Sequence, residues 1–303
     1  MNGTAGKLAS LIVEPGSAAR LDRRDPAWEG GHEFSHLGHD ERRARIDEAL
    51  VRSVSELEEA HELLWASGRY GLLVVLQAMD AAGKDGTIRH VLSGVNPTGV
   101  DVVSFKTPST EELTHDFLWR AAKAMPARGR VAIFNRSHYE EVVAVRVHPD
   151  WLEREGLPAG RRDERFWAER FESINAFEQH AARNGTKIVK LFLHVSKEEQ
   201  RRRLLARLDE PGKEWKFSAA DLAERACWDD YMTAFEEAIS ATSTSWAPWY
   251  VIPADHKQLM RALAAAVIVE AVHSLDLRVP EPTAEQHEAN ERARAELEAE
   301  ASP

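Results

Sequence analysis

The sequence is poor in the features that mark secreted and membrane-spanning proteins. It has one cysteine, Cys227, in 303 residues, which excludes an internal disulfide framework and fits a reducing compartment. No apolar run approaches the roughly 20 residues that a membrane-spanning helix needs. The apolar stretch 8–13 is too short for a secretory signal. We therefore expect a cytoplasmic protein with no membrane partner.

The sequence also has fewer basic than acidic residues. The chain has 39 Lys and Arg against 50 Asp and Glu, for a net charge of −11. An acidic protein repels nucleic acid, so we expect no nucleic-acid partner. A polyanionic substrate would have to meet a local basic cluster, and the sequence offers one between Lys187 and Arg225.

What the chain does contain is alternating strand and helix patterns in a sequence that is 43% hydrophobic. After an irregular segment 1–39, a helix is expected over 40–68. A continuous apolar run typical of a strand buried in a parallel sheet covers 70–77, and further strands are expected over 100–105, 130–134, 187–195 and 249–252. Helical patterns cover 109–125, 161–184, a segment from 196 onward, and 255–275. This alternation predicts an α/β fold, a parallel sheet flanked by helices, in one domain over 40–278. An acidic tail, 279–303, is expected to be a solvated helix or disordered.

The first chemical signal is the segment 76–87, which follows a buried strand and precedes a helix. Small residues there let backbone N–H groups approach phosphate oxygens, as in a P-loop, and a lysine neutralises phosphate charge. The expected phosphate-binding residues are Ala82, Gly83, Lys84, Asp85, Gly86 and Thr87. Ala78 replaces the usual first glycine, and Asp85 replaces the usual Ser or Thr. The alternative is an ordinary strand–helix turn with a surface lysine.

Asp80 lies inside this loop. A carboxylate beside a phosphate is repulsive unless a cation lies between them. Asp80 is therefore predicted to bind Mg²⁺ or to orient the attacking oxygen. Its alternative role is to cap the next helix.

The second signal, 131–141, runs off the end of the third strand. Arg136 can contact phosphate oxygens in a bidentate way, and Asn135 precedes it at the strand end. Glu140 and Glu141 are the nearest acids. Their alternative role is a solvated helix start.

The third signal is a basic stretch interrupted by Pro211 and Gly212, which fits a lid over about 201–228. A lid excludes water and supplies cations to a transferring phosphoryl group. The residues expected to contact polyphosphate are Arg203, Arg207, Lys213, Lys216 and Arg225. The alternative is an ordinary solvated helix face.

Several motifs in one order give the chain its resemblance to polyphosphate kinase family 2. These are Met79–Thr87, Gly94–Pro97, Phe105-Lys106, Phe117–Arg120, Phe134–Glu140, Trp215–Phe217, Trp228–Tyr231, Ala247–Tyr250, and Pro253–Asp255 with Lys257. The resemblance spans about Asp40 to Leu275. It implies a thymidylate-kinase-like P-loop fold with a helical lid, and a homo-oligomer. It also implies reversible, Mg²⁺-dependent phosphoryl transfer from inorganic polyphosphate to adenine nucleotides.

The resemblance also assigns roles to residues. Asp80, Lys84, Arg136 and Glu140 are implied to be catalytic. Lys106, Arg120 and Asn135 are implied to bind the nucleotide, and Asp80 and Glu141 the metal. Glu141 stands where the family pattern has the shorter Asp. Asn135 paired with Glu140 resembles the subclass that accepts AMP as well as ADP, because a neutral Asn repels an incoming phosphate less than Asp does.

Two other functions remain open. One is an ATP-dependent nucleoside monophosphate kinase of the same fold, although such enzymes more often keep Ser or Thr at the position of Asp85. The other is a nucleotide- or polyphosphate-binding protein without catalysis. The presence of Asp80, Lys84 and Arg136 argues against it.

Overall fold

A computed structural model describes residues 8–31, 36–210, 212 and 218–300. The predicted lid residues Lys213 and Lys216 lie outside the described residues.

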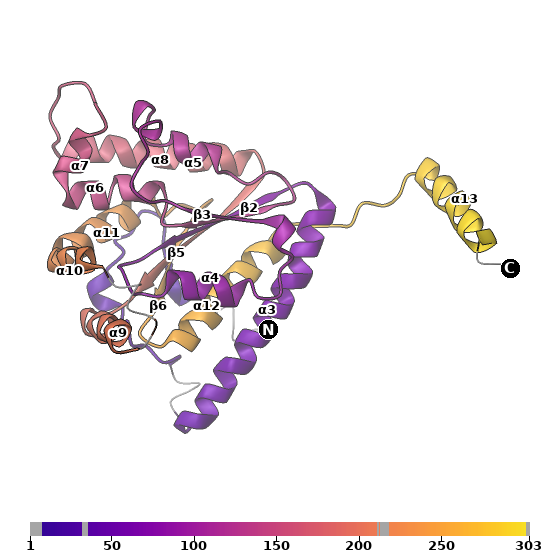
Figure 1. The fold of residues 1–303 in the computed structure, drawn as a ribbon, viewed down its shortest axis with the longest axis horizontal. Helices are drawn as coiled ribbons and strands as arrows, with labels where there is room; N and C mark the ends of the chain where they lie inside the picture. Colours follow the sequence, from indigo (N-terminus) through magenta and orange to yellow (C-terminus); the bar gives the residue numbers. More distant parts are fainter. Residues whose placement is uncertain (1–7, 32–35, 211, 213–217, 301–303) are drawn as a thin grey trace.

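A six-stranded sheet runs through the middle of the molecule in the order β1-β6-β5-β2-β4-β3 (Figure 1). Its strands are β1 (Ile12–Val13), β2 (Gly71–Gln77), β3 (Val100–Ser104), β4 (Val131–Asn135), β5 (Thr186–His194) and β6 (Trp249–Pro253). All neighbours pair in parallel except β1, which is antiparallel to β6. The central strand β2 lies between β4 and β5, so the chain crosses to opposite sides of β2 as it continues. In open α/β sheets, ligands bind at such a point, beyond the carboxyl ends of the strands.

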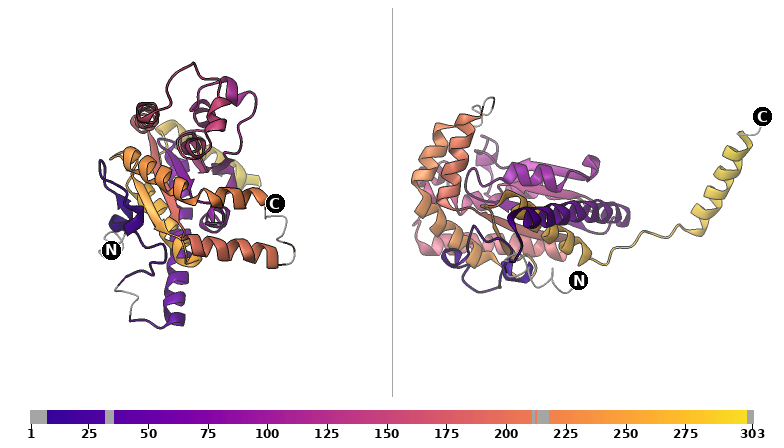
Figure 2. Two further views of the ribbon diagram at one scale, coloured as in Figure 1. Left: turned by 90° about the vertical axis from the view of Figure 1, so that its left-hand side faces the viewer. Right: turned by 90° about the horizontal axis from the view of Figure 1, so that it is seen from below.

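Helices cover both faces of the sheet (Figure 1). One face carries α3 (His39–Ser67), α4 (Lys84–Val91) and α12 (Lys257–His273). The other carries α8 (Glu164–Arg183) and α11 (Trp228–Thr242), with the short helices α5 (Trp119–Lys123), α6 (Ala144–Val147) and α7 (Pro149–Glu153). The pair α9 (Lys197–Asp209) and α10 (Ala219–Ala226) lies side by side at one end of the molecule (Figure 2). The predicted α/β class with a parallel sheet flanked by helices is confirmed.

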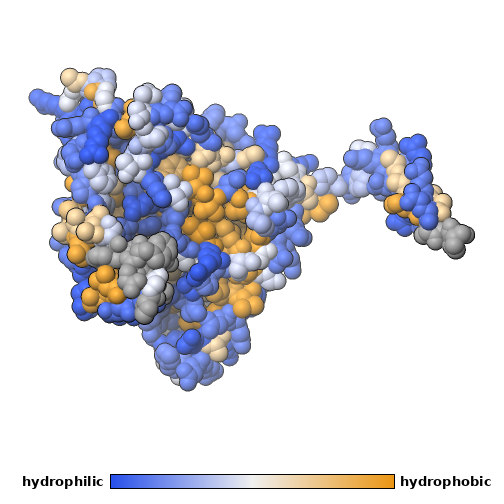
Figure 3. All heavy atoms as spheres, in the orientation of Figure 1, coloured by the Kyte–Doolittle hydropathy of each residue, from blue (hydrophilic) through white to orange (hydrophobic). Residues whose placement is uncertain are grey.

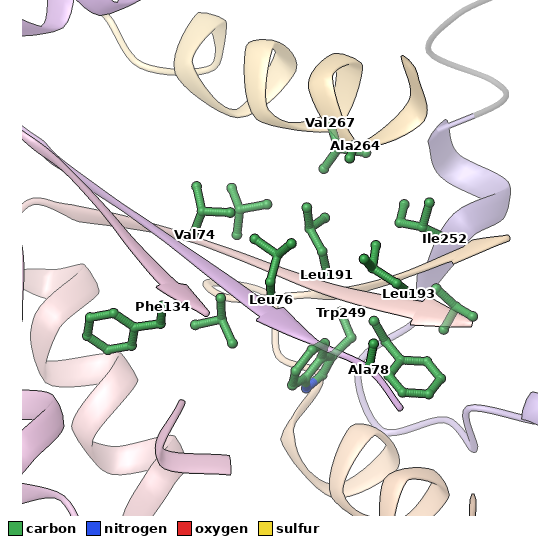
Figure 4. Close-up of a cluster of buried hydrophobic side chains, with 14 of the residues drawn as sticks. Val74, Leu76, Ala78, Phe134, Leu191, Leu193, Trp249, Ile252, Ala264 and Val267 are labelled. Carbon is green, nitrogen blue, oxygen red and sulfur yellow. The ribbon is translucent and has the colours of Figure 1, made fainter. Parts of the chain in front are cut away.

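The strands β2, β4, β5 and β6 are largely buried on both faces, whereas the edge strand β3 has no buried residue. Every residue of β2 is buried, as are the last seven of β5. Figure 4 shows Val74 and Leu76 of β2 packed with Leu191 and Leu193 of β5, and α12 above them. A fully buried side chain of this size contributes about 1.5–3 kcal/mol. This core holds the loops after β2 and β4 at the same edge of the sheet.

The helix predicted over 109–125 is interrupted, so that prediction is wrong in part. Ser109 and Glu112 do form the reciprocal capping hydrogen bonds. These open only a short 3₁₀ turn, η3 (Glu112–Thr114), before the chain becomes extended at His115. The side chain of Asp116 then accepts the backbone N–H of Leu118 at 2.9 Å, which starts a new turn before α5.

The two ends of the chain differ. The N-terminal segment, predicted to be irregular, contributes β1 and a 3₁₀ turn, η1 (Leu21–Arg23). Arg24 fastens it by donating hydrogen bonds to the carbonyl oxygens of Ala19 and Ile12, both 2.9 Å away. At the other end, α13 (Ala284–Glu300) is fully exposed and stands away from the body (Figures 1 and 2).

The face of the molecule in Figure 3 is mostly hydrophilic. On the face in Figure 3, hydrophobic residues gather in the middle, around β3 and α4, while α13 is covered mainly by hydrophilic ones. Over the described part of the chain, no helix combines the length and the apolarity needed to cross a bilayer.

Candidate active site

The loop after β2 has the backbone of a phosphate-binding loop. Gly83 is in a left-handed conformation with φ of 115°, and Ala81, which is not glycine, also has a positive φ of 61°. A residue other than glycine with φ in this range is strained by about 1–3 kcal/mol, and such strained residues are found mainly at functional sites. The turn directs the first residues of α4, from Lys84 onward, toward an open cleft.

Three charged side chains meet at this loop. The Lys84 Nζ donates hydrogen bonds to the carbonyl oxygens of Ala78 and Met79, at 2.8 and 3.3 Å. It also lies 3.9 Å from Oδ1 of Asp80. The same oxygen accepts a hydrogen bond of 2.5 Å from Nη2 of Arg136. Asp80 therefore lies between two cations, one from each of the loops that follow β2 and β4.

Burial and these charges set the ionisation of the site. Burial, together with the positive charge of Arg136, lowers the pKa of Lys84 to about 8. Burial alone would raise the pKa of Asp80. Lys84 and Arg136 outweigh it and hold the pKa below the usual value. Asp80 is thus a carboxylate at neutral pH.

Arg136 joins two cavities. Its φ of 60° is left-handed, and its guanidinium is held between Asp80 and Glu140, whose Oε2 accepts from Nη1 at 3.2 Å. One cavity, of about 630 Å³, is the cleft over the P-loop, and the other, of about 590 Å³, lies over η4 (His138–Glu141) and α7. Phe105, Lys106 and Arg136 line both. We call them the P-loop cleft and the second cavity.

Most of the predicted site residues line one of these cavities. The P-loop cleft contains Asp80, Gly83, Lys84, Asp85, Gly86, Lys106, Asn135, Arg136, Arg203 and Arg207. The second cavity contains Lys106, Arg120, Arg136, Glu140 and Glu141. Asn135 reaches back to the P-loop, where its amide donates to Oδ1 of Asp85 at 2.7 Å.

Of the predicted residues that the structure describes, three line neither cavity. Ala82 is buried in the loop. Thr87 is buried too, and its hydroxyl donates to the carbonyl oxygen of Gly83 at 3.1 Å, inside the first turn of α4. Arg225 donates to the side chain of Gln200 at 2.8 Å, and Gln200 in turn donates to the carbonyl oxygen of Asp80 at 3.0 Å. These residues contact the cleft through the backbone or through a neighbour.

Arg203, which was expected to contact polyphosphate, is not exposed on the surface of α9. Only 6% of it is exposed, and it clamps the P-loop to the segment after β6. Its guanidinium donates to the carbonyl oxygens of Ala81, Ala82, Ala254 and Asp255. Its Nε donates to Glu199 at 2.6 Å. Because all three of its nitrogens have protein acceptors, this side chain holds the strained P-loop in place.

Glu141 and Arg120 form a nearly buried pair in the wall of the second cavity. Arg120 Nη2 donates to Glu141 Oε1 at 2.5 Å, and its Nη1 donates to the carbonyl oxygen of Lys106 at 2.8 Å. Arg170 supports the backbone of Glu141 from behind, with a hydrogen bond of 2.8 Å to its carbonyl oxygen. Burial raises the pKa of Glu141 despite the nearby charge of Arg120.

A buried polar network anchors the segment that carries Arg136 and Glu140. The Lys190 Nζ, on β5, donates to Glu178 at 2.6 Å and to the hydroxyl of Tyr139 at 2.9 Å. Glu178 also accepts from Tyr139 at 2.8 Å and lies 3.3 Å from Nε2 of His138. Lys190 is fully buried, so the basic cluster expected between Lys187 and Arg225 is not one surface. Its first part belongs to the core.

Sequence reasoning gave no role to four cations of the P-loop cleft, although Arg202 lies in the basic stretch and Lys257 in a family motif. They are Arg89 on α4, Arg202 on α9, and Lys257 and Arg261 on α12. They come from three helices far apart in the chain, so the sequence does not show that they meet in one cleft. The signal that was available is the spacing of Lys257 and Arg261, because residues four apart lie on one side of a helix.

Comparisons with known proteins identify the family of the chain. The family model described as Polyphosphate kinase 2 matches residues 40–280. A protein of Rhodopseudomonas palustris named ADP-polyphosphate phosphotransferase is 54% identical over 80% of this chain and 84% of its own length. A protein of Meiothermus ruber named AMP/ADP-polyphosphate phosphotransferase is 45% identical over 89% of this chain and 94% of its own.

The fold has a solved counterpart as well. The crystal structure of Polyphosphate Kinase 2 from Arthrobacter aurescens TC1 superposes with a TM-score of 0.82 at 40% identity. The alignment covers 94% of this chain and 95% of that one. The P-loop, the arginine that follows β4 and the helices α9 and α10 all lie inside the matched span. The chain belongs to the polyphosphate kinase 2 family.

Proposed function

We propose that the protein transfers the terminal phosphoryl group of inorganic polyphosphate to ADP and AMP, and catalyses the reverse reaction. The observation that carries this is the position of Arg136, which is shared by two cavities and held by one acid from each. A site that brings two phosphorylated substrates together needs such a cation at the transfer point. The names of the relatives from R. palustris and M. ruber support the same donor and acceptors.

The P-loop cleft is proposed to hold polyphosphate. Its backbone N–H groups at the start of α4, together with Lys84, can bind the terminal phosphate. Arg207, on α9, adds positive charge from the opposite wall. Arg203 is proposed to act mainly by fixing the loop.

The second cavity is proposed to hold the nucleotide. It combines apolar lining, from Leu113, Val145 and Trp151, with charged groups near Arg136. This division suits a base at one end and phosphates at the other. Lys106 and Arg120 lie where they can meet the acceptor phosphate, and Arg120 is fixed by its pair with Glu141.

The site fits a divalent cation at Asp80. Among the described residues there is no cluster of three or more potential ligand side chains. Mg²⁺, however, is usually held by one or two carboxylates together with substrate phosphates and water. Asp80 is ionised and faces the cleft, so it is the proposed ligand. Glu141 is committed to Arg120, and this geometry favours a supporting role for it over the predicted metal-binding one. When bound, the ion would neutralise phosphate charge.

The transfer itself needs no covalent enzyme intermediate. An oxygen of the nucleotide's terminal phosphate attacks the end phosphorus of the polyphosphate. The new P–O bond forms as the bond to the bridging oxygen breaks, and that oxygen leaves on the shortened chain. Lys84 and Arg136 stabilise the negative charge that spreads over the transferred group. Asp80 and Glu140 hold Arg136 in position.

The acceptor choice rests on Asn135 and Glu140. Asn135 is neutral and donates to Asp85, so it adds no negative charge opposite the incoming phosphate. This is compatible with AMP as well as ADP.

The test supplies AMP, long-chain polyphosphate and Mg²⁺ without ATP. We expect ADP to appear first and ATP second. Phosphorylation of added ADP alone would contradict the AMP acceptor but keep the donor. Phosphorylation of AMP only when ATP replaces polyphosphate would identify an ATP-dependent monophosphate kinase. Tight binding with no turnover would identify a non-catalytic binding protein.

A further inference from the structure

The arginines of α9 are largely neutralised by acids close by. Arg201 pairs with Glu198, and Arg202 pairs with Glu199, each with a shortest N–O distance of 2.6 Å. Glu199 also accepts from Arg203. An arginine that already has a carboxylate partner gains less from a second anion than a free one does. The lid helix is therefore a weaker polyanion surface than its sequence suggests.

The part of the P-loop cleft formed by α4 and α12 is a wall with cations of another kind. Arg89, Lys257 and Arg261, which we call the distal cation group, form no ion pair within the described part of the chain. Arg261 donates to Gln258 at 2.9 Å, while its Nε is buried and without a hydrogen-bond partner. A buried donor left unpaired costs about 1–3 kcal/mol.

These cations also repel one another. Burial lowers the pKa of Lys257, and the charges of Arg203, Arg202 and Arg261 contribute, although Glu199 opposes them. Burial likewise lowers the pKa of Arg261, with contributions from Arg89 and Arg203. Like charges gathered in one cleft are unfavourable unless an anion lies among them.

Two members of the distal cation group, Arg89 and Arg261, lie along the first turns of α4. A Cβ on Gly86 would meet Nη2 of Arg261 at 3.3 Å, so this guanidinium lies against the start of α4. Arg89 is on the same helix, three residues after Gly86 and therefore on the same side. Arg136, in contrast, is held at Asp80 and Glu140.

We infer that the distal cation group binds the phosphates of the donor chain that follow the transferred one, and thereby sets a preference for long polyphosphate over short. This rests on the proposed function of the P-loop cleft. A donor of three phosphates would engage the P-loop and Arg136 and gain little from this wall. A long donor would bring an anion between Arg89, Lys257 and Arg261, and so relieve their repulsion.

The test compares the double variant Lys257→Gln/Arg261→Gln with the intact protein on two donors. Each exposed charge contact is worth up to about five-fold in binding. We therefore expect KM for long-chain polyphosphate to rise about ten-fold, KM for tripolyphosphate to change less than about two-fold, and kcat at saturation to be kept. Arg183→Gln, at the exposed end of α8, is the matched control and should change neither KM.

An equal rise of KM for both donors, or no rise for either, would overturn the inference. A loss of folding is checked by the thermal unfolding midpoint, and the single variant Arg89→Gln, on another helix, gives an independent reading. Binding of long-chain polyphosphate without nucleotide separates this inference from the proposed function. Weaker binding by the double variant supports the distal cation group even where no transfer occurs, and unchanged binding contradicts it.

Discussion

The P-loop cleft and the second cavity are built in different ways, although they share Arg136. The floor of the cleft comes from one continuous segment, 78–87, whose backbone and single lysine are suited to phosphate. The second cavity takes its lining from separate segments, around 105–113, Arg120 and 140–155. Phosphate is recognised by a local backbone shape, whereas a nucleotide needs side chains brought together by the fold. The first kind of site is readable from sequence, and the second is largely not.

The largest effect is expected from removing the buried network of Lys190 and Glu178, which supports the segment shared by both cavities. Lys190→Met leaves Glu178 buried without its cation, which should cost about 3–5 kcal/mol of stability. Urea denaturation measures the loss. The double variant Lys190→Met/Glu178→Leu should recover most of it, because no buried charge is left unpaired. If the single variant were as stable as the intact protein, the network would not anchor the segment with Arg136.

Removing the lysine of the cleft should affect the chemistry more than the fold. Lys84→Ala is expected to lower kcat by about 10²–10³, by analogy with the loss of one charge-stabilising donor. Stopped assays with ADP and polyphosphate measure this. Turnover within a few-fold of the intact protein would contradict the assignment of the cleft to phosphoryl transfer.

A change in the wall of the second cavity should act on the other substrate. Arg120→Met removes the partner of Glu141 and the hydrogen bond to the carbonyl oxygen of Lys106. The loss of one charge-assisted contact predicts a rise in KM for ADP of about ten-fold. KM for polyphosphate should stay within two-fold. If instead the polyphosphate KM rose and the ADP KM did not, the two cavities would be assigned the wrong way round.

The smallest effect expected is one of pH. With its pKa lowered to about 8, Lys84 is charged below that pH and neutral above it. Only the charged form attracts phosphate, so kcat/KM for polyphosphate should fall several-fold as pH rises from about 7.5 to 9. The variant Lys84→Arg stays charged throughout and should lack this fall. The same fall in that variant would assign it to another group.

What could be predicted from the sequence differs in the same way between the P-loop cleft and the rest of the site. Lys84, Asp80 and Arg136 could be placed together because parallel strands end at one edge of the sheet. The helix 109–125 could not be placed correctly, because Asp116 starts a new turn where the periodicity suggested a continuous one. The roles of the arginines of α9 could not be predicted either. The sequence does not show that Arg203 contacts the buried P-loop while Arg201 pairs with Glu198 on its own helix. Pairing partners, more than charge itself, distinguish these residues.

The two residues of β1 affect how a shortened form of the protein would behave. By pairing with Trp249 and Tyr250, β1 covers the outer edge of β6. The family match begins only at residue 40, so a protein trimmed to that boundary would keep the P-loop and lose this cover. The bared edge of β6 would then offer unpaired N–H and C=O groups to any extended peptide, including another copy of itself. We therefore expect a protein trimmed to residue 40 to self-associate more readily than the full chain, because the edge of β6 is uncovered and not because the catalytic domain is defective.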